Sequence, residues 1–165
     1  MGLITKCVLI DVLLSVFVPF SISAQSVMAG SHQKSYAFRL KPHEDLKQGI
    51  LRFAADHKIK AGCIVTTVGS LEQCNLRFAN QPKGTELSGH FEIVSLVGTF
   101  SETYGHMHLL VSDSTGRTIG GHLLDGNKVF TTAEIVILEL TELEFGRIKD
   151  DTYGYEELIV KPRNN

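Results

Sequence analysis

The chain has 165 residues, of which 43% are hydrophobic and 21% are charged, and its formal net charge is −2. This length and composition indicate a globular domain with a substantial core and exclude long disordered regions. The slightly acidic balance, without any run of Lys or Arg, argues against a free-standing nucleic-acid-binding protein, so we expect no direct nucleic-acid binding.

The first part of the chain, residues 1–27, differs in character from the rest. Lys6 precedes an apolar run over residues 7–20, and the small residues that follow are typical of a signal peptide cleaved near residue 24. The run is too short for a membrane span, so none is expected in the mature form. Met28 also reads as an ordinary protein start. Two localisations stay open: secreted if residues 1–24 act as a signal peptide, and intracellular if residues 1–27 are an upstream extension and translation starts at Met28.

One helix is predicted near the start of the globular part. The alternation of residues 34–40 predicts a first strand. Pro42 is tolerated at the first position of a helix, so we expect the helix to begin there, with Glu44 and Asp45 in its first turn. The apolar face of this helix consists of Leu46, Ile50, Phe53 and Ala54.

The remainder of the chain is rich in β-forming residues. Residues 63–68 form a nearly continuous apolar run, which predicts a strand buried on both faces. Further strands are expected over residues 72–79, 91–100, 129–140 and 155–160, with a polar connection over residues 144–151. The predicted fold class is α+β: one domain over residues 34–161, with a mainly antiparallel β-sheet and one principal helix packed on it.

The three cysteines, Cys7, Cys63 and Cys74, have no CxxC spacing, so neither a zinc ribbon nor a redox motif is predicted. Cys63 and Cys74 either pair in an oxidising compartment or are buried as small apolar side chains.

Residues 105–124, GHMHLLVSDSTGRTIGGHLL, predict a β-hairpin that carries three of the seven histidines. His106 and His108 are two positions apart, so on a strand they point to the same face. If His122 lies opposite them on the second arm, the three imidazoles are close enough to share one metal ion, and zinc suits such ligands.

The turn of this hairpin decides whether the three histidines meet. Asp113 and Gly116 favour a three-residue loop that pairs Asp113 with Arg117. That register places His108 opposite His122. A two-residue loop would turn His122 to the other face and separate it from the rest of the cluster.

Other residues are candidates for supporting roles around this cluster. A metal-bound imidazole needs a hydrogen-bond partner on its second nitrogen, and Thr132 and Glu134 share one face of an expected strand from which they could supply it. For Glu134, a cross-strand or subunit-interface ion pair is the alternative. Gly120 and Gly121 permit close approach of a backbone or a ligand beside His122, or else mark a kink in the strand.

Three motifs, in this order, resemble one known family. GHFEIVSLVGTF (89–100), the hairpin segment (105–124) and TTAEIVILEL (131–140), together with KPHEDLKQGI near the expected helix, are similar to the plant and prokaryote conserved (PPC) domain over residues 34–145. The resemblance implies a mainly antiparallel sheet with a packed helix, and a homotrimer.

The resemblance also bears on the functional residues. Plant members usually accompany AT-hooks, which need an Arg-Gly-Arg core that this sequence lacks, so the chain resembles the stand-alone, prokaryotic-type members. In those members the histidines at positions 106, 108 and 122 are candidate metal ligands. The segment that holds Glu92 contacts partners in the plant proteins, which makes Glu92 a candidate interface or ligand contact. His90 stands where those proteins have Arg.

The sequence leads to three functional hypotheses. The first is a homotrimeric module that binds a metal, zinc by preference, through His106, His108 and His122, together with a small ligand. The second is a transcription-related regulatory protein that reaches DNA through DNA-binding partners. The third is a metal-dependent hydrolase in which the metal activates water and Glu134 acts as the general base. The chain has no GxSxG, P-loop or GxGxxG motif, so neither a nucleophile nor a nucleotide cofactor is indicated.

Overall fold

The structure is a computed structural model that describes residues 30–164, so the expected leader, residues 1–27, lies outside the described residues. One helix and eight strands follow one another in the order β1 (Gln33–Leu40), α1 (Leu46–Asp56), β2 (Gly62–Arg77), β3 (Thr85–Phe100), β4 (Gly105–Ser112), β5 (Thr118–Leu123), β6 (Lys128–Leu140), β7 (Leu143–Lys149) and β8 (Glu156–Pro162). The mainly antiparallel sheet with one principal helix agrees with the predicted α+β class.

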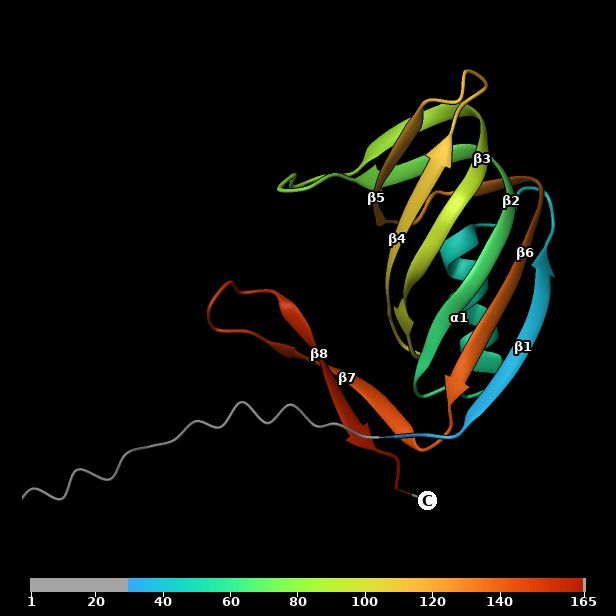
Figure 1. Cartoon of the computed structure of the whole chain (residues 1–165). Coiled ribbons are helices and arrows are strands. Elements are labelled where there is room, and N and C mark those ends of the chain that lie inside the picture. Colours follow the sequence, from blue (N-terminus) through green and yellow to red (C-terminus); the bar gives the residue numbers. More distant parts are fainter. Residues whose placement is uncertain (1–29, 165) are drawn as a thin grey trace, which may run out of the picture.

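Six strands form one antiparallel sheet in the order β1-β6-β2-β3-β4-β5 (Figure 1). The long strand β2 is bent by register shifts on both of its edges. At its C-terminal end β2 also pairs with β5, through Leu76 opposite Leu123 and Arg77 opposite His122. Because β5 pairs with β4 on one edge and with β2 on the other, strands β2 to β5 curl into a closed unit.

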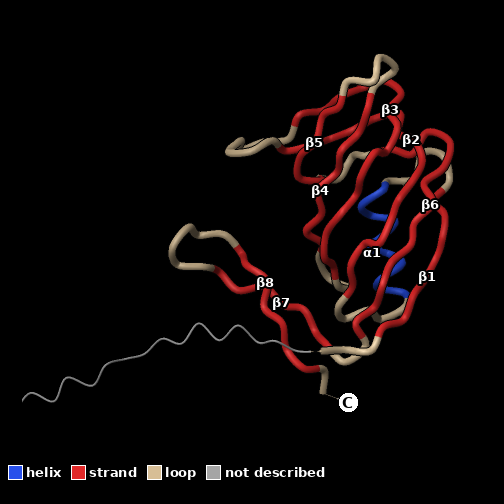
Figure 2. Tube along the Cα trace, viewed as in Figure 1, coloured by secondary structure: helices blue, strands red, loops and turns tan. Residues whose placement is uncertain are grey.

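Helix α1 lies against one face of this sheet (Figures 1 and 2). Its side chains Leu46, Ile50 and Ala54 are fully buried and belong to the same core cluster as Phe100, Met107 and other residues of the strands. The predicted apolar face of the helix is therefore confirmed at these positions. Phe53, the fourth predicted member, is partly buried and stacks on Phe38 with ring centroids 4.0 Å apart.

The helix begins four residues later than the sequence indicated. Asp45, rather than a residue near Pro42, is the N-cap: its backbone is extended and its Oδ1 accepts a hydrogen bond from the Gln48 amide at 3.0 Å. The second oxygen, Oδ2, accepts from the Gly126 amide at 2.6 Å. The helix start is thus set by a contact between its cap and a distant turn, which proline chemistry alone does not reveal.

Strand β2 differs from the expected strand over residues 63–68 in two ways. Val65 and Val68 are 52% and 53% exposed, so the prediction of burial on both faces is wrong for the single chain. The strand also continues through Gly69 and Ser70 instead of ending there, because Gly69 adopts a φ of 144° at a register shift and lets the Thr132 carbonyl approach. The two strands predicted over 63–68 and 72–79 are one.

The predicted polar connection over residues 144–151 is also wrong, because most of it is strand β7. β7 and β8 form a separate antiparallel hairpin (Figure 2). Leu143 and Phe145 are buried against Ala61 in a second, smaller core cluster, and the Tyr104 hydroxyl donates to the Gly146 carbonyl at 3.1 Å. These contacts fix the base of the hairpin to the main body.

Cys63 and Cys74 are both free thiols, so they do not form the disulfide that was one of two alternatives. Cys74 is buried, and desolvation raises the pKa of its thiol to about 12. Within residues 30–164, no helix has both the length and the apolar character that crossing a membrane requires.

Replacing Asp45 by Ala tests the link between the helix cap and the turn at Gly126. The substitution removes the acceptor for two backbone amides, so we expect the free energy of unfolding to fall by about 1–3 kcal/mol. Urea unfolding followed by circular dichroism measures the loss. Asp56→Ala, at the other end of the same helix, is the matched control and leaves stability unchanged or slightly raised, since an acidic residue is unfavourable there. Equal losses in both variants would contradict the assignment.

Candidate metal centre

The turn between β4 and β5 has the three-residue loop that the sequence predicted. The Asp113 amide donates to the Arg117 carbonyl at 2.9 Å, and the Gly116 amide donates to the Asp113 carbonyl at 2.9 Å. Gly116 has a φ of 81°, the left-handed conformation expected of it. Oδ1 of Asp113 accepts from the amides of Thr115 and Arg117, at 2.8 and 3.1 Å. The loop therefore fixes the hairpin register, with His108 directly opposite His122.

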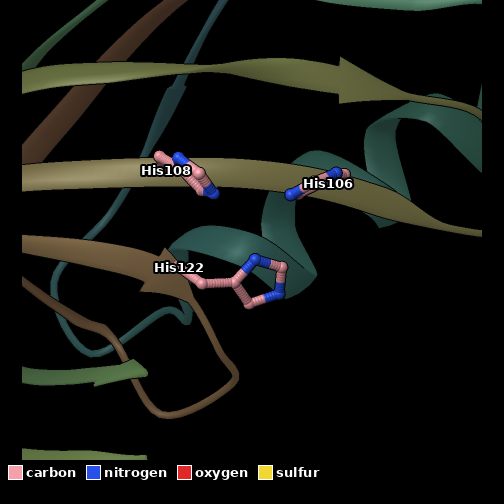
Figure 3. A group of neighbouring side chains, drawn as sticks. All are labelled: His106, His108 and His122. Carbon is pink, nitrogen blue, oxygen red and sulfur yellow. The ribbon is translucent and has the colours of Figure 1, made fainter. Parts of the chain in front are cut away.

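This register brings the three histidines together on the outer face of the hairpin (Figure 3). The ring centroids of His106, His108 and His122 are 5.1 to 5.7 Å apart. One ligand nitrogen from each ring lies within 4.8 Å of the other two. Met107 and Leu109 alternate with them along β4 and are buried in the core, which is why His106 and His108 face outward.

The three residues fit a metal ion by their chemistry as well as by their spacing. Nδ1 of His122 is buried and has no hydrogen-bond partner in the structure, a costly arrangement for a polar atom unless a ligand satisfies it. In Figure 3 the three rings surround a common space. Zinc takes imidazole nitrogens at roughly 2.0–2.1 Å, and small side-chain rotations would let nitrogens at this spacing reach one ion.

The surroundings favour the neutral form of these imidazoles. Burial, and then the Arg77 guanidinium, lower the pKa of His122 to about 4. Burial and then the charge of Arg147 also lower the pKa of His106. Because only the neutral ring can donate a lone pair to a metal, both shifts prepare the cluster for metal binding at neutral pH.

The structure does not bring the predicted supporting residues Thr132 and Glu134 to this cluster. Both lie on β6, whose neighbours in the sheet are β1 and β2, not β4 or β5. Glu134 is opposite Arg39 on one side and Val68 on the other. Arg77 is the residue of β2 that lies opposite His122, and Val68 precedes it by nine residues. Along an extended strand, Val68 and its neighbour Glu134 are therefore roughly 30 Å from Arg77.

The other candidate residues have more local roles. A side chain at Gly121 would place its Cβ 2.8 Å from the Arg77 carbonyl oxygen, so this glycine permits the close approach of β5 to β2. A Cβ at Gly120 would lie 3.0 Å from both the Leu109 carbonyl oxygen and a side-chain methyl group of Leu110. Glu92 is exposed on β3, between Ser70 and Ser112, away from the histidines.

A pocket of about 500 Å³ adjoins the cluster and contains residues that the sequence did not single out for it. Its lining includes His106 and His122 together with Arg77, Tyr104, Gly105, Arg147, Tyr155, Glu156 and Glu157. Four of these come from the β7–β8 hairpin. A signal existed in the sequence: Leu143 and Phe145 alternate with polar residues, and Asp150 to Gly154 is a turn-forming run, which together indicate a hairpin.

A larger hollow of about 680 Å³, beside His90 and the Asp113 turn, contains none of the three histidines.

Solved structures similar to this chain include proteins from Salmonella, Archaeoglobus fulgidus and Bacteroides thetaiotaomicron. A hypothetical protein from Salmonella is 39% identical, with a TM-score of 0.81, and the match covers 82% of this chain and 99% of that one. A protein from Archaeoglobus fulgidus described as metal-containing is 27% identical, with a TM-score of 0.68, over 76% of this chain and 93% of that one. A protein from Bacteroides thetaiotaomicron, provisionally described as DNA-binding, is 22% identical with a TM-score of 0.66 over 79% and 98% of the two chains, and at that identity it shows the shared fold only.

A curated relative from Synechococcus, the bifunctional protein GlmU, is 44% identical over 126 residues. The match covers 76% of this chain but only 20% of that protein, so the chain spans about a fifth of the length of this relative.

The family comparison covers most of the chain. The model of the Plants and Prokaryotes Conserved (PCC) domain matches residues 27–141, which include α1, the β4–β5 hairpin and all three clustered histidines. Together with the 39% identity to the Salmonella protein, this match confirms the resemblance drawn from the sequence motifs. The chain belongs to the Plants and Prokaryotes Conserved domain family.

Proposed function

We propose that this chain is a metal-binding PCC domain, spanning residues 34–161, that holds a zinc ion through His106, His108 and His122 and acts as a homotrimer. The observation that carries the proposal is the approach of three imidazole nitrogens to within 4.8 Å of one another. Three imidazoles leave a fourth position of a tetrahedral ion for a water molecule or a small ligand. The metal-containing description of the Archaeoglobus fulgidus protein supports it.

A binding role is favoured over hydrolysis. A zinc-bound water would have a pKa near roughly 7, but hydrolysis also needs a positioned general base. Glu134, the base that the hydrolase hypothesis required, lies on β6, away from the cluster. The net charge of −2 gives no electrostatic basis for direct DNA contact, so any regulatory role would act through partner proteins.

Trimer formation would resolve the exposure of apolar side chains on the sheet. Val65 and Val68 on β2 and Val94 and Val97 on β3 are each more than half exposed on the face opposite the helix. Phe130 on β6 is 37% exposed and stacks on His90 with centroids 4.1 Å apart. Several exposed apolar side chains on neighbouring strands of one sheet are typical of a subunit interface.

The metal content of purified protein tests the site directly. We expect about one zinc ion per chain in the wild type and almost none in the His106→Ala/His108→Ala variant. Inductively coupled plasma mass spectrometry measures the zinc content. His32→Ala/His43→Ala is the matched control and keeps its metal, since these two histidines are exposed and pair with Glu142 and Glu72 instead. A wild type without stoichiometric metal, or a double variant that retains it, would refute the metal site.

The pH dependence of zinc affinity provides a second test. Three histidines of ordinary pKa would each lose a proton on binding zinc below about pH 6. Because the pKa of His122 is lowered to about 4, this ring is already largely neutral there, and the lowered pKa of His106 reduces the proton loss from that ring as well. The logarithm of zinc affinity should therefore rise with pH by fewer than about two units per pH unit between pH 5 and 6, against about 2.7 for three ordinary imidazoles. A slope of about 2.7 would contradict the lowered values.

The trimer is tested by one charge in the apolar face. Val68→Glu should give monomers in sedimentation equilibrium, because an interface would have to bury an unpaired carboxylate. Tyr153→Glu, at an 80% exposed position in the β7–β8 turn, is the control and stays trimeric. If the wild type itself sediments as a monomer, the trimer is excluded.

A further inference from the structure

Two arginines lie in the same pocket as the histidine cluster. Arg77, at the end of β2, is directly opposite His122 across the β2–β5 pair, so both side chains point to the same side of the sheet. Arg147 reaches the pocket from β7. Arg77 and Arg147 are partly buried, whereas Arg39 and Arg117 are exposed.

These two arginines have no acidic partner of their own. Arg52, Arg117 and Arg163 each form an ion pair with a carboxylate, but within residues 30–164 neither Arg77 nor Arg147 has a carboxylate oxygen within 4.0 Å. Arg147 donates instead to the Glu156 carbonyl at 3.1 Å and lies over the Tyr104 ring, 4.7 Å from its centroid. These contacts hold the guanidinium in place and leave its charge uncompensated by direct pairing.

The charge balance of the pocket favours a negatively charged occupant. The lining holds two arginines and two glutamates, Glu156 and Glu157, whose formal charges cancel. A divalent cation on the neutral histidines would raise the sum to +2. Such a charge is costly in a partly desolvated pocket unless an anion offsets it.

We propose that Arg77 and Arg147 form an oxyanion subsite beside the histidine cluster and select a small molecule with a carboxylate or phosphate group. Guanidinium groups bind both kinds of oxyanion through paired, charge-assisted hydrogen bonds. A pocket of about 500 Å³ suits a small metabolite rather than a polymer. The subsite rests on the proposed function, since it identifies the class of ligand that the metal centre takes.

The carboxylates of the β7–β8 hairpin do not take the place of this ligand. The group of residues whose ligand atoms lie within reach of one ion contains only the three histidines among the described residues, and neither Glu156 nor Glu157 belongs to it. Glu157 is near enough to His106 to act on it electrostatically, but both glutamates are exposed. They border the pocket and leave its interior to an external anion.

Isothermal titration calorimetry with inorganic phosphate and with acetate tests the subsite. Both anions are titrated into wild-type protein loaded with zinc and freed of excess metal, and into metal-free protein. We expect one binding site per chain, and a loss of affinity of about tenfold or more in Arg77→Gln and in Arg147→Gln. Arg147→Lys keeps the positive charge but removes the paired N–H donors of the guanidinium, so it should lose less affinity for the anion than Arg147→Gln. Arg39→Gln, on β1, is the matched control and binds as the wild type does. A preference for phosphate or for acetate identifies which oxyanion class the pocket takes.

The metal content and the far-ultraviolet circular dichroism of each preparation separate the possible failures. Zinc-loaded wild type that binds neither anion, or arginine variants that bind as the wild type does, would overturn the subsite and leave the metal centre standing. Arginine-dependent anion binding by a protein that takes up no zinc when zinc is supplied would refute the metal centre and support the subsite. If the arginine variants lose zinc or secondary structure together with the anion, their role is structural and the subsite is wrong. Glu157→Gln should bind the anion more tightly, and a loss of zinc in that variant would show that Glu157 itself is the fourth ligand.

Discussion

The pairing of β5 with the far end of β2 is the constraint on which the rest of the site depends. Two residue pairs make this contact, Leu76 with Leu123 and Arg77 with His122, and Gly121 lets the two backbones approach. Without it, β5 would be an edge strand held by β4 alone, and His122 would be free to move relative to His106 and His108. The same pairing also brings Arg77 from a distant part of the sequence to the side of His122. The histidine cluster and the position of Arg77 beside it therefore both depend on the pairing of β2 with β5.

A buried asparagine, Asn127, stabilises the pairing of β2 with β5 through its hydrogen bonds. Asn127 is fully buried; its side-chain amide donates to the carbonyl groups of Asn75 and Leu124, and its Oδ1 accepts from the Asn75 amide. Asn75 is two residues from Arg77, and Leu124 is two residues from His122, so this side chain ties β2 to the end of β5. The adjacent Gly126 is held by Asp45, the cap of α1. Helix, turn and site are thus parts of one hydrogen-bonded unit, in which both polar atoms of the Asn127 side chain are satisfied.

Local chemistry was enough to predict some of these features and not others. The Asp113 turn could be predicted because its residues act on one another within five positions, and that turn alone sets the register of His108 and His122. The start of α1 could not, because Asp45 takes its role partly from Gly126, 81 residues away. Arg77 is 45 residues from His122 in the sequence, and only the long-range return of β5 to β2 places it at the cluster. Glu134 was expected beside the histidines but lies elsewhere, because the spacing of residues along one strand does not reveal which strands become neighbours in the sheet. The exposed valines of β2 were predicted to be buried because an apolar sequence pattern does not distinguish a side chain in the core from one exposed on the face of the sheet.

The residues of the proposed site come from two parts of the chain, the main sheet and the β7–β8 hairpin. The three histidines and Arg77 lie within residues 27–141, the part that matches the family, whereas Arg147 and the two glutamates lie beyond it on a hairpin with its own small core. Metal ligation would then depend on the sheet alone, whereas ligand choice would be shared between the sheet, through Arg77, and the hairpin, through Arg147. Substitutions in the hairpin can accumulate without disturbing the β2–β5 closure. On the proposed function, a lineage can therefore acquire a new ligand while it keeps an unaltered metal centre.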